Sequence, residues 1–135
     1  MSPTPANEIK EAVLDKVANG QIWTTARGRS NYSISGKIIH LRFCSSNKLR
    51  SSHYKFNINP NTLMADYEVW VCGSINSYYL MPINLMTQIY SDPQSYVDSL
   101  HPEIRVVSVS IETHMVNYGR GGKKLDIAPY YNKIL

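Results

Sequence analysis

Alternation of apolar and polar residues runs through much of the chain and predicts a protein built mainly of strands. The clearest stretch is residues 37–44. One face of this predicted strand is wholly apolar and is expected to be buried; it carries Ile39, Leu41 and Phe43. The other face carries His40 and Arg42 close together, because side chains two residues apart in a strand point the same way.

Periodicity and turn residues divide the rest of the chain into elements. Helical spacing predicts a helix over residues 7–18 and another that begins at Pro82, with two further helical turns over residues 94–100. Ser35-Gly36 predicts a tight two-residue turn of a hairpin. Further strands are expected over residues 21–25, 32–34, 53–58, 67–72, 77–81, 104–111, 115–118 and 124–127.

These elements predict an α+β (mixed α/β) fold with a central, mixed, single β-sheet flanked by helices. The length of 135 residues suits one domain. We expect residues 7–135 to form this domain and residues 1–6 to be a disordered N-terminal tail.

No apolar run reaches the 18 residues of a membrane span and no signal sequence is present, so we expect a cytoplasmic protein without membrane contact. Cys44 and Cys72 lie in apolar runs and are expected to be buried, reduced thiols.

Acidic and basic residues are segregated along the chain. The net charge is +4, yet no carboxylate lies between Lys16 and Ala65. The basic residues of that interval are Lys16, Arg27, Arg29, Lys37, Arg42, Lys48, Arg50 and Lys55. A positive field concentrated on one surface attracts phosphate groups. Nucleic acid is therefore the expected partner, ahead of an anionic membrane surface.

Several basic segments are candidate contacts for such a partner. His40 and Arg42 either lie on a solvated strand face or bind phosphate, with Arg42 as a bidentate donor. The loop 45–55 mixes cations with hydroxyl groups, which suits contact with a nucleic-acid backbone. The turn 27–32 is compact and basic, and arginine is the commonest reader of guanine. The residues expected to contact nucleic acid are Arg27, Arg29, Lys37, Lys48, Arg50, His53 and Lys55.

The succession of segments resembles the restriction-endonuclease-like PD-(D/E)XK superfamily of restriction and homing nucleases. The resemblance covers about residues 8–90 and is one of pattern rather than of a strict motif. It is carried by Glu11 in the first helix, by residues 32–34, 38–46 and 53–58, by Ala65-Asp66-Tyr67-Glu68-Val69-Trp70-Val71-Cys72, and by residues 78–82.

The resemblance implies positions for the catalytic residues. Nucleases of this superfamily hold Mg²⁺ with carboxylates and use a lysine to steer or stabilise the attacking water. Here the aspartate falls on Ser33 or Asn31, the Glu/Gln on His40 and the lysine on Arg42, so all three positions depart from the pattern. Glu11 offers one carboxylate, and Asp66 or Glu68 is a further candidate. The implied catalytic set is therefore Glu11, Ser33, His40 and Arg42, with Mg²⁺ if the protein is active, in a homodimer or homotetramer.

The sequence leaves alternatives open. The chain is a nuclease-derived binder of double-stranded DNA that no longer cuts, or a nuclease whose catalytic positions were altered for crystallisation. A third alternative is an enzyme that uses His40 or His53 as a general base and Arg42 or Lys55 to stabilise the transition state. We favour the first. A different class is a non-enzymatic regulator or inhibitor that binds an acidic protein surface. Such a protein would present exposed apolar anchors, whereas mixed hydroxyl and cationic loops suit phosphate and sugar.

Overall fold

The computed structural model describes residues 5–45 and 52–135. Helices and strands follow the chain as α1 (Pro5–Ala18), β1 (Trp23–Thr25), β2 (Asn31–Ile34), β3 (Lys37–Cys44), β4 (His53–Ile58), β5 (Tyr67–Cys72), β6 (Tyr78–Pro82), α2 (Ile83–Ser91), β7 (Arg105–Ser110), β8 (Met115–Gly119) and β9 (Lys123–Asp126). Two short 3₁₀ helices, η1 (Pro60–Met64) and η2 (Ala128–Tyr130), complete the described elements. The prediction of a disordered tail over residues 1–6 falls largely on residues outside the described part, and α1 already begins at Pro5.

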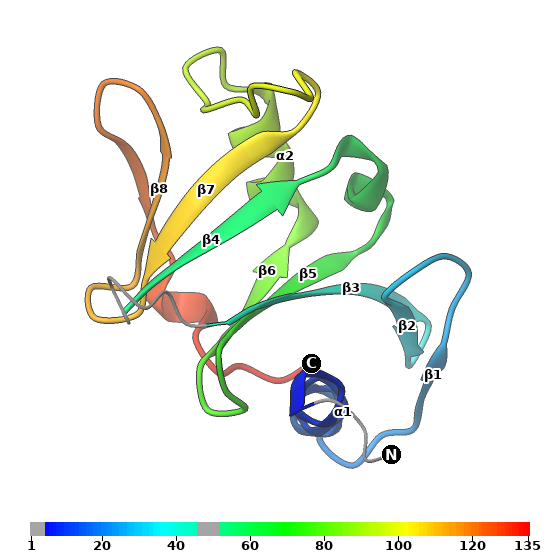
Figure 1. Ribbon diagram of the computed structural model, residues 1–135. Coiled ribbons are helices and arrows are strands. Elements are labelled where there is room, and N and C mark those ends of the chain that lie inside the picture. The colour runs from blue at the N-terminus through cyan, green and yellow to red at the C-terminus, as the bar shows by residue number, and fades with distance from the viewer. Residues whose placement is uncertain (1–4, 46–51) are drawn as a thin grey trace.

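The first sheet has the strand order β1-β2-β3-β5-β6 (Figure 1). The hairpin β2–β3 turns at Ser35 and Gly36, whose φ angles of 50° and 81° are the pair of positive values that a two-residue type I′ turn requires. β3 and β5 are parallel, with His40 opposite Glu68 and Arg42 opposite Trp70, and the other neighbours are antiparallel. This register decides which side chains meet at the site described below.

The helix α1 covers one face of the first sheet. Val13, Leu14 and Val17 are fully buried on its inner side. They pack on the apolar residues that alternate along the strands, among them Ile34, Ile39, Leu41, Val69, Val71, Tyr78 and Leu80. The C-terminus returns to the same layer, where the amide of Leu135 donates to the carbonyl of Val17 at 3.0 Å (Figure 1). The predicted apolar face of residues 37–44 is thus confirmed as a core face.

A second sheet and α2 cover the opposite side. The second sheet has the order β4-β7-β8-β9 and is antiparallel throughout. Its inner face and α2 share a core with Trp70, Cys72, Tyr79 and Met81 of the first sheet. The expectation of a single sheet is therefore corrected, because β4 pairs with β7 and not with a strand of the first sheet.

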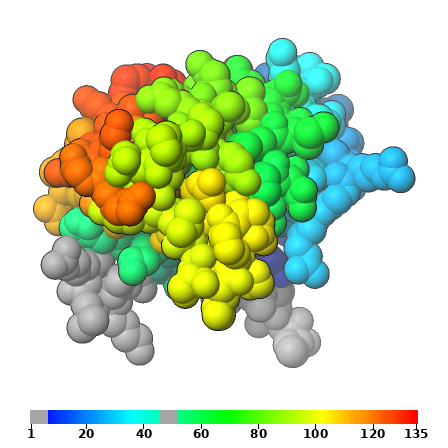
Figure 2. Space-filling view, turned by 90° about the horizontal axis from the view of Figure 1, so that it is seen from above, coloured from blue at the N-terminus to red at the C-terminus, as the bar shows by residue number. Residues whose placement is uncertain are grey.

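The predicted helical turns over residues 94–100 are also wrong. Ser95 forms a bridge to Gly119, and Val97 forms one to Arg105. The amide of Tyr96 donates to the carbonyl of Tyr118, so the backbone of this segment is bonded to β8 instead of to itself. Seen from above, the segment following α2 projects from the body (Figure 2). Within the described residues, no helix is long and apolar enough to cross a membrane.

Candidate nucleic-acid interface

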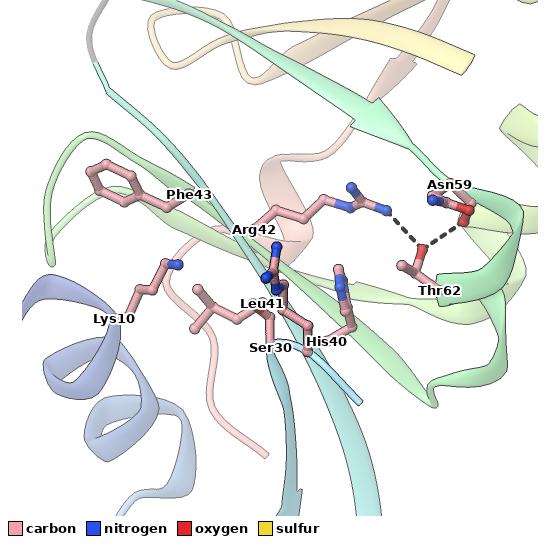
Figure 3. A pocket seen from close by; sticks show the side chains of 9 residues that line it. Lys10, Ser30, His40, Leu41, Arg42, Phe43, Asn59 and Thr62 are labelled. Carbon is pink, nitrogen blue, oxygen red and sulfur yellow. Dashed lines mark hydrogen bonds between the residues drawn. The ribbon is translucent and has the colours of Figure 1, made fainter. Parts of the chain in front are cut away.

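A groove lies along the edge of β3 beyond the point where β2 ends. The last β2–β3 pair is Asn31 with His40, and the last bond joins the Leu41 amide to the Ser30 carbonyl at 3.0 Å. From Arg42 onward this edge no longer pairs with β2, so side chains from both faces of β3 border the groove. Its volume is about 440 Å³, and it is lined by Lys10, Arg29, Ser30, His40, Leu41, Arg42, Phe43, Asn59 and Thr62 (Figure 3).

A buried carboxylate holds the two polar residues of β3. Glu68, on β5, is completely buried. Its Oε1 accepts from Arg42 Nε at 2.7 Å and lies 3.2 Å from His40 Nδ1. Its Oε2 is buried and has no hydrogen-bond partner among the described residues. One negative charge therefore anchors two side chains that are themselves mostly buried, with 11% and 14% of the His40 and Arg42 side chains exposed.

Arg42 also ties three segments together. Its Nη1 donates to the carbonyl of Asn57 at the end of β4, and its Nη2 donates to Thr62 Oγ1 at 2.7 Å. Thr62 in turn donates to the carbonyl of Asn59 at 2.8 Å (Figure 3). Three of the five guanidinium donors are thus used inside the protein. The guanidinium still contributes its charge to the groove, but its position is set by the fold.

Lys10 and Arg29 are the cations that remain available. Both line the groove, and neither has an ion pair or hydrogen bond with another described residue. Lys10 reaches the groove from α1 (Figure 3), and Arg29 from the β1–β2 connection. With Arg42 they place three positive charges around one carboxylate that faces inward. The groove is therefore electropositive even when His40 is neutral.

A second hollow continues the groove on the far side of Ser30 and Asn31. It has a volume of about 190 Å³ and shares Thr62 with the groove. Arg27 lines it, opposite the η1 residue Met64, which is 88% exposed. The segment around residues 25–30 projects from the body (Figure 2). Arg27 and Arg29 thus border successive parts of one concave surface.

The structure brings some of the sequence-predicted residues together and separates others. His40, Arg42 and Arg29 share the groove, and Arg27 lies in the adjoining hollow. Glu11 is exposed on α1 and Ser33 pairs with Ile38, and neither lines the groove. Lys37 lies at the opposite end of β3 from Arg42. His53 and Lys55 line hollows of the second sheet, and Lys48 and Arg50 lie outside the described residues.

Two residues matter more in the structure than sequence reasoning indicated. Lys10 was not predicted, because a lysine on the polar side of a helix carries no signal of its own. Glu68 was considered only as one candidate carboxylate among several. Its signal was present, since it is the one charged residue inside the apolar run 67–72, and a buried charge requires partners.

The donor set of this groove does not fit Mg²⁺. Magnesium requires several hard oxygen ligands, usually carboxylates with bound water. Glu68 is the carboxylate at the groove, and its Oε1 is already shared by Arg42 and His40. Asp66 directs Oδ2 to the amide of Ile38 at 2.8 Å. Within the described residues no three His, Cys, Asp or Glu side chains gather in a way that could hold a metal ion.

Comparison with known proteins bears on the fold. No protein-family model matches the chain, and no curated protein matches it in sequence. A solved structure that does match is the bacterial homing endonuclease I-Ssp6803I, with a TM-score of 0.51 and 13% identity over 98% of this chain and 88% of that chain. The predicted fold class is confirmed: the chain has an α+β, nuclease-like fold. At this identity the likeness concerns the fold alone.

Proposed function

We propose that this protein binds double-stranded DNA through the groove beside β3 and does not cut it by metal-dependent hydrolysis. The observation that carries the proposal is the distribution of charge at the groove. Lys10 and Arg29 are unpaired there among the described residues, while the one acid, Glu68, is buried beneath and held by Arg42 and His40. Such a surface attracts a phosphate backbone, and the described residues that line it include no carboxylate that repels it.

The nuclease-like fold supports the same partner. The matching solved structure is, by its title, a homing endonuclease. The residues that stand here at the PD-(D/E)XK positions are a histidine and an arginine, and the carboxylate behind them is committed to both. We therefore propose that the protein is a binder derived from this superfamily, and that it acts in the cytoplasm.

A salt titration of duplex binding tests the proposal. In fluorescence anisotropy, the logarithm of the association constant should fall linearly with the logarithm of salt concentration, with a slope of about −0.9 for each phosphate contact. Lys10→Ala combined with Arg29→Ala should reduce this slope by about two contacts. Lys37→Ala is the matched control, because Lys37 is an exposed cation at the other end of β3. Absence of binding at low salt, or equal loss in the control, contradicts the proposal.

Cleavage is tested separately. Supercoiled plasmid incubated with the protein and Mg²⁺ or Mn²⁺ should remain uncut. Nicking that disappears in His40→Ala but persists in Lys37→Ala would show instead that the groove is an active site.

A second candidate function is binding to an acidic protein as a regulator or inhibitor. The observation that favours it is Met64, whose side chain is almost fully exposed beside Arg27 in the adjoining hollow. An exposed apolar residue next to a cation is typical of a protein-binding anchor. Met64→Ser should leave duplex binding unchanged if DNA is the partner, and duplex binding absent at low salt would favour this second function.

A further inference from the structure

The outer face of the second sheet is a second polar surface that the groove does not include. Alternation along the strands directs Tyr54, Phe56 and Ile58 of β4 inward, so that the residues between them face outward. The register continues this row across the sheet, with Lys55 opposite Ser108, Ser108 opposite Asn117 and Asn117 opposite Lys124. We call this row and its neighbours His53, Ser110 and Met115 the outer face.

The outer face is hollowed instead of flat. One hollow of about 240 Å³ is lined by Lys55, Tyr96, Val106, Val107, Ser108 and Asn117. Another, of about 320 Å³, is lined by His53, Ser108, Ser110, Glu112, Thr113, Met115, Asn117 and Lys124. Ser108 and Asn117 belong to both hollows. They therefore lie where the two hollows meet, at the centre of the outer face.

Asn117 has an unmet hydrogen-bonding requirement at this centre. Its Oδ1 is buried and has no partner among the described residues. A buried amide oxygen without a donor is costly, and native structures satisfy such atoms with water or a ligand. The hydroxyl of Ser108 and the ammonium groups of Lys55 and Lys124 likewise make no bond with another described residue. Free donors thus border the hollows around one acceptor that lies beneath their surface, and a ligand reaches this acceptor when the Asn117 amide turns outward.

Charge on the outer face is balanced, because two lysines are matched by two carboxylates. Lys55 and Lys124 are exposed cations. The carboxylates nearby are Glu112 at the rim and Asp126 on β9, and Asp126 Oδ1 accepts from the amide of Ala128 at 2.9 Å. The face is therefore less basic than the groove. Its content of amide and hydroxyl groups suits hydrogen bonding to bases better than binding to phosphate.

The strand β4 connects the two surfaces. The carbonyl of Asn57 at its end accepts from Arg42, and Asn59 directly after it lines the groove. Lys55 and His53 lie two and four residues back along the same strand, a distance of roughly 7 to 13 Å. The major groove of DNA is about 12 Å wide and admits a two-stranded β-ribbon, so two neighbouring strands of this sheet, and not all four, fit into it. A duplex whose backbone lies in the groove can therefore present its base edges to the outer face.

We propose that the outer face reads base edges in the major groove of the duplex, with Asn117 as the central reading residue. This inference rests on the proposed function. The carboxamide of asparagine can accept and donate at once, and the base edge that matches this pair is adenine, through N6 and N7. The groove sets affinity and register, and the outer face supplies the sequence preference.

Selection from a random duplex library tests this inference. The wild-type protein should enrich sequences with an A·T pair at a fixed position. Asn117→Ala should abolish that preference, lowering discrimination by about 10-fold or more at that position, while its salt slope and its binding to non-selected duplex stay within about 2-fold. Lys10→Ala with Arg29→Ala should weaken binding to all sequences and keep the preference. Thermal unfolding of each variant shows that the fold is intact.

The failure of this inference is distinguishable from the failure of the proposed function. If wild-type protein binds duplex with a steep salt dependence but enriches no sequence, or if Asn117→Ala retains the preference, the outer face is only a solvated sheet face and the inference is overturned. If wild-type protein binds no duplex at low salt, the proposed function and this inference fall together.

Discussion

At the scale of the residue, the decisive feature is one carboxylate that serves two basic side chains. Glu68 is inaccessible to water, and Arg42 and His40 share its Oε1. Removing a carboxylate from water costs several kcal/mol unless cations and hydrogen-bond donors compensate. The arginine therefore depends on the glutamate as much as the glutamate depends on the arginine. A lone basic pair on a strand, as read in the sequence, is in fact part of a three-residue cluster.

Substitution of Glu68 should lower the stability of the folded protein strongly. We expect Glu68→Ala to lower the free energy of unfolding by about 3–5 kcal/mol, because it leaves the Arg42 charge partly buried without a partner. Glu68→Gln should cost less, since its amide oxygen can still accept from Arg42 Nε. Urea unfolding monitored by tryptophan fluorescence measures both. The exposed Glu112→Gln is the control and should change stability by less than about 0.5 kcal/mol; an equal effect of all three variants would contradict the role assigned to Glu68.

The carboxylate of Asp92 leads to a prediction about the stability of the protein at low pH. The amide of Gln94, which donates to Oδ1 at 2.8 Å, lowers the pKa of Asp92 below its ordinary value of 3.8, with help from Lys123 and Tyr118 and against some desolvation. The folded state therefore favours the carboxylate. Its stabilisation is complete above the ordinary value and is lost as pH falls through the lowered one.

Asp92→Asn should consequently lower Tm at neutral pH, because the pairing with Lys123 at 3.3 Å disappears. The difference in Tm between the variant and the wild type should shrink toward zero as pH falls through the lowered pKa of Asp92. Thermal unfolding by circular dichroism at a series of pH values measures it. A difference that stays constant over this range would mean that the charge of Asp92 is irrelevant to stability.

At the scale of the element, α1 and the first sheet depend on the apolar side of the helix and not on its acids. Val13, Leu14 and Val17 are fully buried, while Glu11 is exposed. Truncation of a buried leucine leaves a cavity that neighbouring side chains fill only partly. Leu14 packs in the core that also contains Ile39 and Leu41 of β3. The packing of α1 on the first sheet therefore also holds β3, whose edge borders the groove, in position.

We expect Leu14→Ala to destabilise the protein by about 3 kcal/mol. Glu11→Ala should change stability by less than about 0.5 kcal/mol and should leave duplex affinity unchanged, since Glu11 does not line the groove. Chemical unfolding and anisotropy on the two variants measure these effects. Strong loss of DNA binding in Glu11→Ala with intact folding would restore the catalytic or binding role that the sequence pattern implied.

Most of the elements and the β2–β3 hairpin could be predicted from the sequence, and the division of the strands between two sheets could not. Alternation identifies β4 from Tyr54, Phe56 and Ile58, but an alternating strand has the same pattern in whichever sheet it pairs. The antiparallel pairing of β4 with β7 is therefore evident only from the structure. The error over residues 94–100 has a similar origin, because backbone bonds from Tyr96 to Tyr118 outweigh a weak helical preference.

At the scale of the whole molecule, the segregation of charge seen in the sequence is kept only in part. Arg27, Arg29 and Arg42 gather around the groove and its adjoining hollow. Lys16 instead donates to the carbonyl of Ile75 and lies over the ring of Tyr78, and Lys55 belongs to the outer face. The absence of acidic residues from a segment is evident from the sequence. The side of the molecule on which each cation lies depends on how the strands pair, which the sequence does not show. Lys10, outside that segment, reached the groove because α1 packs beside β3.

The groove as a whole should work without divalent cations. Its positive charge comes from side chains, and its carboxylate is paired with Arg42 and lies within hydrogen-bond distance of His40. We expect Mg²⁺ at constant ionic strength to leave duplex affinity unchanged or to lower it, because Mg²⁺ competes with Lys10 and Arg29 for DNA phosphates and no bound Mg²⁺ bridges the protein to the DNA. Isothermal titration of the protein with Mg²⁺ should show no saturable heat. An affinity that rises tenfold with Mg²⁺ would contradict the assignment of the groove.

The pairing of β4 with β7 also has a consequence during synthesis. Tyr54 lies opposite Val109 in the sheet, and Val109 is synthesised 55 residues later. At about 5–20 residues per second the ribosome needs roughly 3–11 s to supply it. During that interval β4 lacks the strand with which it pairs, and contacts so distant in sequence form slowly. The nascent chain therefore carries an unpaired strand edge until its last third has emerged.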